Sequence, residues 1–105
     1  MTAERVGRLA DMEPCSVRQV TVGGRTIALV RIDDDVYAID DVCTHQNISL
    51  SEGEVLCEDR QLECWKHGSA FSVVDGEPHA LPATKAVRVY GARVVDGEIE
   101  VTIDA

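Results

Sequence analysis

The strongest constraint on the fold is the alternation of apolar and polar residues in short runs that end at Gly or Asp. Residues 98–104 alternate strictly, and a period of two residues is typical of a β-strand with one face in water. Residues 17–22 and 25–32 form two β-rich runs on either side of Gly23-Gly24, a pair that favours a tight hairpin turn. The sequence therefore predicts a protein built from antiparallel strands.

The rest of the chain continues this pattern and offers little to a helix. Asp75-Gly76 and Asp96-Gly97 each follow two valines, and Asp-Gly is a favoured pair in tight turns. No window of about ten residues has the periodicity of an amphipathic helix, although a single turn could form at residues 9–13. Further strands are expected at residues 36–40, 86–90 and 92–95. Many short strands in one chain favour an all-β fold, either an antiparallel sandwich or a small barrel.

Length and charge limit what such a protein does. The chain has 105 residues, 45% of them hydrophobic, which suffices for one core, so residues 1–105 are expected to form a single domain. The 19 acidic residues outnumber the 10 basic residues and give a net charge of −9. This charge argues against binding to nucleic acid or to an anionic membrane surface, and it favours a basic protein partner. A small acidic carrier or binder fits these numbers better than a self-contained enzyme.

The oxidation state expected of the cysteines depends on the compartment in which the chain resides. No run approaches the roughly 20 apolar residues of a membrane span, and residues 1–12 lack the apolar core of a signal peptide. The expected compartment is the cytoplasm, where cysteines are reduced or bound to metal rather than paired in structural disulfides. Cys15 and Cys57, which belong to no motif, are expected to be small buried hydrophobic residues.

Potential metal ligands gather between residues 41 and 71, where the alternation weakens. Cys43 and His45 form a C-x-H pair, and Cys64 and His67 form a C-x-x-H pair. Two irons bridged by two sulfides need four outer ligands. The Rieske arrangement results if each pair places its Cys on one iron and its His on the other. A zinc site with two Cys and two His is the alternative, although zinc ligands are usually spaced as a Cys pair and a His pair.

Around these ligands the sequence resembles the Rieske [2Fe–2S] proteins, and within them the small stand-alone ferredoxins. The resemblance rests on the C-x-H pair, on the run from residue 64 to residue 71, on the flanking strands and on the total length. It implies a Rieske-type antiparallel fold with a cluster-binding subdomain near residues 41–71. A covering loop near residues 81–84 would contain Pro82. One [2Fe–2S] cluster would be held by four residues: Cys43 and Cys64 on the inner iron, His45 and His67 on the outer iron.

The resemblance also assigns roles to residues beside the ligands. Gly68 would let the backbone pass close to the cluster, because it has no Cβ, and Trp65 would shield the cluster rim or contact a partner. Ser69 occupies the position of a Ser whose hydroxyl bonds to cluster sulfur. Phe71 stands where high-potential members have a Tyr that does the same. Losing that hydrogen bond lowers the reduction potential, as do nearby acidic residues, so we expect a value on the order of −150 mV.

The expected function is the transport of single electrons, without catalysis. A flavin-dependent reductase that uses NADH or NADPH is expected to donate electrons to a monomeric ferredoxin. By resemblance, a terminal ring-hydroxylating oxygenase would accept them. The acidic residues between 52 and 63 are expected to be solvated and could steer a basic reductase.

Two other functions stay open on the sequence. One is a Rieske protein that is accessory to iron–sulfur cluster assembly or to redox sensing. The other is a zinc-bound interaction module, which would be colourless. An oxygenase in its own right would need two more His and a carboxylate for a mononuclear iron, and only His79 remains.

Overall fold

The computed structural model describes residues 2–42, 49–65, 68–80 and 85–103. For Thr2 and Ala80 it describes the backbone alone. In these residues the protein is built of β-strands and two short 3-10 turns, η1 (Leu9–Asp11) and η2 (Leu50–Glu52), which confirms the predicted all-β class. None of the described segments forms a helix long and apolar enough to cross a membrane.

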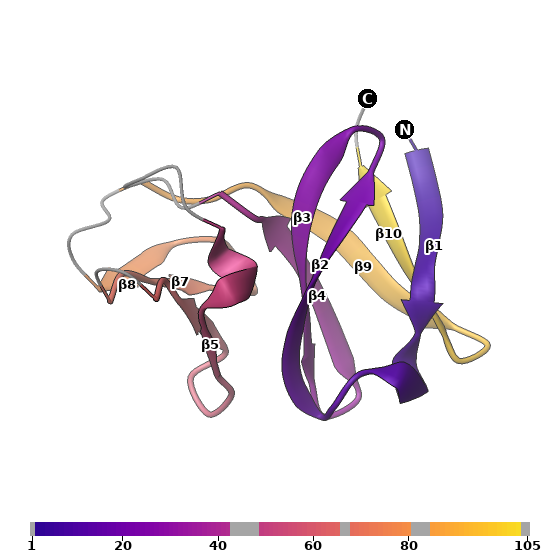
Figure 1. Ribbon diagram of the computed structural model, residues 1–105, viewed down its shortest axis with the longest axis horizontal. Coiled ribbons are helices and arrows are strands. Elements are labelled where there is room, and N and C mark those ends of the chain that lie inside the picture. The colour runs from indigo at the N-terminus through magenta and orange to yellow at the C-terminus, as the bar shows by residue number, and fades with distance from the viewer. Residues whose placement is uncertain (1, 43–48, 66–67, 81–84, 104–105) are drawn as a thin grey trace.

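The strands form two antiparallel sheets, which lie side by side in Figure 1. The large sheet contains, in order across it, β1 (Thr2–Arg8), β10 (Glu98–Ile103), β9 (Val89–Val95), β4 (Asp35–Asp40), β3 (Arg25–Ile32) and β2 (Cys15–Val22). The small sheet contains, in order, β5 (Glu54–Leu56), β6 (Gln61–Glu63), β7 (Ala70–Ser72) and β8 (Pro78–Ala80).

Two of the predicted hairpin turns are confirmed, and their backbone explains the residues found there. Gly23 and Gly24, between β2 and β3, have φ angles of 57° and 80°. Asp96 and Gly97, between β9 and β10, have φ angles of 52° and 78°. Positive φ at both central residues is what a type I′ hairpin requires. The other Asp-Gly pair lies in a longer connection, residues 73–77, between β7 and β8.

Two strands differ from the sequence-based prediction. Residues 86–88 lie outside the strands, and β9 runs through Gly91 without a break, because Gly91 pairs with Thr102 of β10 like its neighbours. The N-terminal strand β1 was not predicted. It pairs with β10 at the edge of the sheet, with a shift in register between Arg5 and Gly7. Its side chains are mostly exposed, so the apolar pattern that predicts strands is weak there.

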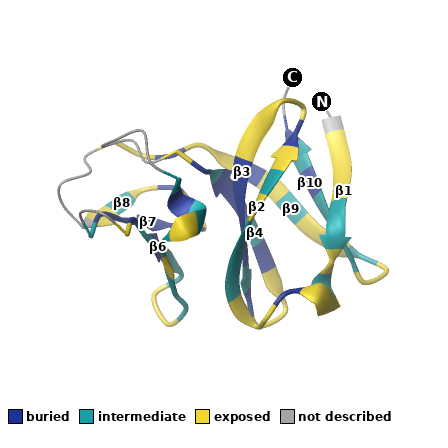
Figure 2. Ribbon diagram, in the orientation of Figure 1, coloured by how far each residue is buried: buried dark blue, intermediate teal, exposed yellow. Residues whose placement is uncertain are grey.

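Strand β3 is buried on both faces, and it connects the cores of the two sheets (Figure 2). Ile27 and Leu29 belong to an apolar cluster formed within the large sheet. Their neighbours Ala28 and Val30 point to the other face, because successive side chains of a strand alternate. There they join a second cluster that includes, from the small sheet and its connections, Leu50, Leu62, Cys64, Phe71 and Val73.

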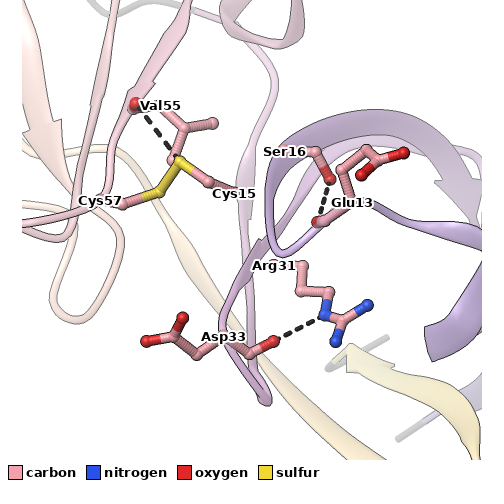
Figure 3. Close-up of a disulfide and its surroundings, with 7 residues drawn as sticks. All are labelled: Glu13, Cys15, Ser16, Arg31, Asp33, Val55 and Cys57. Atoms are coloured by element: carbon pink, nitrogen blue, oxygen red, sulfur yellow. Dashed lines mark hydrogen bonds between the residues drawn. A yellow bond between two sulfur atoms is a disulfide. The ribbon is translucent and has the colours of Figure 1, made fainter.

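A disulfide between Cys15 and Cys57 joins the two sheets covalently (Figure 3). Cys15 begins β2 and is exposed, whereas Cys57 follows β5 and is partly buried. The prediction of two reduced, buried cysteines is therefore wrong. The fold brings the start of β2 against the turn between β5 and β6, so two residues separated by 42 positions meet at a Cα–Cα distance of 6.2 Å. No local pattern in the sequence predicts this contact.

The same turn of the small sheet has a second, noncovalent attachment to the large sheet. Arg60 lies in the turn between β5 and β6, and its Nη1 donates a hydrogen bond of 2.6 Å to the hydroxyl of Tyr37 in β4. The guanidinium carbon lies 5.7 Å from the centre of the Tyr37 ring, and Nη1 lies 3.4 Å from Oδ2 of Asp35. The turn is thus fixed to β2 by the disulfide and to β4 by Arg60.

Candidate metal centre

The C-x-x-H motif begins at Cys64, directly after β6, and backbone hydrogen bonds form a turn that joins Cys64 to Gly68 and Ser69. Cys64 is 1% exposed. Its amide donates a hydrogen bond of 2.6 Å to the carbonyl of Ser69, and its carbonyl accepts one of 3.1 Å from the amide of Gly68. These two bonds close the turn around the Cys64 thiol without involving the side chain. Trp65, the next residue, is 54% exposed.

Gly68 is required in this turn by its backbone conformation. Its φ is +74°, in the left-handed region that L-residues with a side chain rarely adopt. A Cβ built on Gly68 would have no atom of the described residues within 4 Å. The structure therefore gives a reason for a glycine here, its positive φ, while the predicted role of passing close to a cluster stays a prediction.

The described residues on either side of the C-x-H motif are held together. Val42 and Ser49 form an isolated antiparallel bridge, and the amide of Leu50 donates a hydrogen bond of 2.5 Å to the carbonyl of Asp41. The chain therefore leaves β4 and returns to the same point before it enters η2. Cys43, the first predicted ligand, directly follows Val42 in the chain.

Strand pairing brings the described segment before β5 next to Cys64, the first residue of the C-x-x-H motif. Glu54 at the start of β5 lies opposite Glu63 at the end of β6. The chain therefore enters β5 beside the point where Cys64 leaves β6. The packing is close, since a Cβ on Gly53 would lie 1.8 Å from the carbonyl oxygen of Glu63. Leu50, which follows the first loop, and Cys64 belong to the same buried cluster.

Most of the predicted ligand set lies outside the described residues. This holds for Cys43, His45 and His67, and also for Pro82 and the predicted covering loop. Within the described ranges, no three His, Cys, Asp or Glu side chains gather as a metal site would require. Cys64 fits the role of a cluster ligand, because its thiol is buried in a closed turn next to the loop with the other motif.

Several predicted residues around the C-x-x-H motif and in the acidic run lie within the described ranges. Ser69 and Phe71 are both fully buried, and Phe71 shares the apolar cluster with Cys64. His79 is exposed, as expected, but it lies in β8 rather than in a loop. The acidic residues that follow the first loop are solvated as predicted: Glu52, Glu54, Glu58 and Asp59 are exposed and Glu63 is partly exposed.

Two ionisable groups near the sheets have shifted pKa values. Burial raises the pKa of Tyr90, and the hydrogen bond of 3.0 Å that its hydroxyl donates to Asp40 acts in the same direction. The pKa of Asp75 is lowered, chiefly because the amide of Glu77 donates a hydrogen bond of 3.0 Å to its carboxylate. Neither group belongs to the predicted ligand set.

Sequence reasoning missed the role of Asp41. Its carboxylate is 2% exposed and accepts hydrogen bonds from three residues, Gln19, Ser49 and Ser51. The available signal in the sequence was an Asp two residues before the C-x-H motif, together with two serines a few residues after it. Gln19 lies in β2, more than twenty positions away in the chain, and no sequence pattern indicates that contact.

Comparison with known proteins identifies the family. A model of the Rieske [2Fe–2S] domain matches residues 3–91. Ferredoxin CarAc of Metapseudomonas resinovorans is 39% identical over 98 residues, which are 92% of this chain and 90% of that protein.

Two solved structures are similar in fold as well as in sequence. The ferredoxin of carbazole 1,9a-dioxygenase from Nocardioides aromaticivorans IC177 has a TM-score of 0.95 and 35% identity, over 99% of this chain and 100% of that chain. A chain in the complex of reduced oxygenase and oxidized ferredoxin in carbazole 1,9a-dioxygenase has a TM-score of 0.86 and 40% identity, over 94% of this chain and 91% of that chain. With a family model that matches most of the chain and this extent of similarity, the chain belongs to the Rieske [2Fe–2S] domain family.

Proposed function

We propose that this protein is a ferredoxin, a one-electron carrier and not an enzyme. It takes electrons from a flavin-dependent NAD(P)H reductase in the cytoplasm and passes them to a terminal ring-hydroxylating oxygenase. The observation that carries the proposal is the position of Cys64, buried in a closed turn beside the end of the C-x-H loop, in a chain of the Rieske family.

The proposed cofactor is one [2Fe–2S] cluster, with Cys43 and Cys64 on one iron and His45 and His67 on the other. When bound, the cluster accepts and releases one electron. The cysteine thiolates and the histidine imidazoles would bind the irons. Burial of Cys64 keeps water away from its sulfur. We propose that the whole chain, residues 1–105, forms one domain that acts as a monomer.

The partners follow from the similar proteins. One similar structure is a ferredoxin of a dioxygenase, and another shows such a ferredoxin in complex with its oxygenase. This supports an oxygenase as the electron acceptor of the present protein. The reductase is inferred from the chemistry, because a one-electron carrier needs a donor that splits the two electrons of NAD(P)H, which is what a flavin does.

The proposal is tested by a redox titration of the purified protein followed by electron paramagnetic resonance. We expect a rhombic signal in the reduced state with the low average g value of mixed Cys and His ligation, at a potential on the order of −150 mV. A colourless protein that contains zinc would contradict electron transfer. A third outcome is a protein that shows this signal and accepts electrons from a reductase, yet fails to pass them to any oxygenase. That result would favour the accessory role in cluster assembly.

Reduction by a flavoprotein should depend on salt. The chain carries a net charge of −9, so attraction to a basic reductase is screened as ionic strength rises. We expect the second-order rate constant for reduction to fall several-fold between about 50 mM and about 500 mM salt. Stopped-flow measurement of the visible absorbance gives this rate, and a rate that does not change would contradict electrostatic steering.

A matched pair of variants locates the steering charges. Glu52→Gln/Glu54→Gln removes two exposed charges close to the cluster loops, and Asp33→Asn/Asp34→Asn removes two exposed charges in the turn between β3 and β4. We expect the first variant to be reduced more slowly than the second at low salt. Equal rates would mean that only the net charge matters.

Phe71 offers a test of what sets the potential. Phe71→Tyr restores the hydroxyl that high-potential relatives place here, in the same buried cluster as Cys64. A hydrogen bond to sulfur favours the reduced state, and about 1 kcal/mol corresponds to roughly 40 mV for one electron, so the potential should rise by about that amount. The matched control is Phe71→Leu, which adds no donor. An equal rise in both variants would attribute the shift to altered packing.

A further inference from the structure

Asp41 is a buried carboxylate placed between the large sheet and the loop of the C-x-H motif. It is 2% exposed, although it follows the end of β4 directly. A carboxylate is costly to bury unless hydrogen bonds replace the lost water, and here they do. Oδ1 accepts from the amide of Ser51 at 2.8 Å, and Oδ2 accepts from Nε2 of Gln19 at 2.7 Å and from the hydroxyl of Ser49.

The backbone of Asp41 is held as firmly as its side chain. Its amide donates a hydrogen bond of 3.2 Å to the carbonyl of Thr26 in β3, and its carbonyl accepts one of 2.5 Å from the amide of Leu50. One residue is thus attached to the large sheet and to the segment that follows the loop. The two attachments fix the start of the loop relative to its end.

The partners of Asp41 lie on both sides of the loop and on a third strand. Ser49 and Ser51 follow the loop, and their hydroxyls lie 2.8 Å apart, so they form one network. Gln19 in β2 bonds both to Asp41 and, at 3.2 Å, to the hydroxyl of Ser49. Because the network spans the two ends of the loop, the Asp41 carboxylate adds side-chain hydrogen bonds to the backbone contacts that already hold these ends together.

We propose that Asp41 is a positioning residue for the cluster. Its carboxylate sets the separation of the loop ends at Val42 and Ser49, and thereby the placement of Cys43 and His45 within the loop. This inference rests on the proposed cluster but goes beyond it, because it assigns cluster retention and geometry to a residue that does not bind iron.

Two substitutions at Asp41 and one at its neighbour test the proposal. Asp41→Ala removes both acceptor oxygens and so breaks three hydrogen bonds, from Nε2 of Gln19, the hydroxyl of Ser49 and the amide of Ser51. Asp41→Asn keeps the size of the side chain and one acceptor, so the bond from Ser51 can persist. The control is Asp40→Asn, which removes the same charge one residue earlier. Asp40 accepts from the hydroxyl of Tyr90 and takes no part in the network around Asp41.

The measurements are made on the iron-loaded protein. We expect the loss of cluster to a chelator to be at least about tenfold faster in Asp41→Ala and several-fold faster in Asp41→Asn, in proportion to the bonds lost. It should stay within about twofold of the unchanged protein in Asp40→Asn. The g values should shift in the Asp41 variants alone. Hydrogen exchange should show faster exchange of the Leu50 and Ser51 amides in the same variants.

The outcomes separate the two levels of the proposal. If the unchanged protein holds no iron–sulfur cluster, the proposed function fails. If it holds the cluster and all three variants match it in g values and in the rate of cluster loss, Asp41 does not position the loop. Should Asp41→Ala not fold, Ser49→Ala removes one donor and leaves the carboxylate in place. A smaller acceleration of cluster loss is then expected, and none would contradict the proposal.

Discussion

Replacing Cys64 by Ser is expected to abolish cluster binding while leaving the fold intact. Iron–sulfur clusters are held by thiolates, and a Ser hydroxyl does not ionise in the range in which a Cys thiol does. The turn should persist, because its two hydrogen bonds join the backbones of Cys64, Gly68 and Ser69 and do not use the thiol. We expect iron content and visible absorbance to fall below about a tenth of those of the unchanged protein, since one of the two thiolate ligands of the proposed cluster is lost.

The matched control for this loss is the double variant Cys15→Ser/Cys57→Ser. It removes two sulfurs that the structure places in a disulfide, one of them in the turn at the opposite end of β6 from Cys64. This variant should keep its iron, its colour and its paramagnetic signal. Full iron content in Cys64→Ser, or loss of iron in the double variant, would mean that the ligands are assigned to the wrong cysteines.

The same double variant is expected to be much less stable than the unchanged protein. The disulfide closes a loop of 42 residues, for which the chain-entropy model gives about 4 kcal/mol of free energy of unfolding. That is a large share of the 5–15 kcal/mol typical of a whole domain. Arg60 and the shared apolar cluster still hold the sheets together, so we expect a folded but weakened protein. Urea unfolding followed by circular dichroism measures the difference.

A thiol reductant provides the control for this second prediction. Cys15 is exposed, so a dithiol can reach its sulfur and open the bridge in the unchanged protein. Reductant should lower the urea midpoint of the unchanged protein to that of the double variant and leave the double variant unaffected. Titration of the denatured, iron-free protein should find two thiols before reduction and four after it, given the four cysteines of the chain. Four thiols before reduction would rule out the disulfide.

The parts of the fold that sequence predicts are those with long, regular local patterns. Strands β2, β3 and β10 are long enough for their alternation to be recognised in the sequence. Gly-Gly marks the turn before β3, and Asp-Gly marks the turn before β10. The strands of the small sheet have three residues each, which is too short for a pattern. Strand β1 is largely exposed at an edge, so burial does not impose alternation on it.

The candidate site shows the same division between local and distant information. The spacing of Cys and His within each motif predicts the ligands because residues so close in sequence are close in space. Gly68 follows from the same motif, and its positive φ agrees. The bond between Gln19 and Asp41, and the bridge between Cys15 and Cys57, join distant strands. Such contacts depend on how the two sheets pack, which no single segment encodes.

The exposure of Trp65 gives the protein an optical label of its own. Trp65 is the single tryptophan of the chain, directly follows Cys64, and has 54% of its surface open to solvent. Its fluorescence therefore originates beside the proposed cofactor and at the protein surface. Loading with iron and binding of a partner can both be followed through one emission band, without attaching a dye to a protein whose small size leaves little surface to spare.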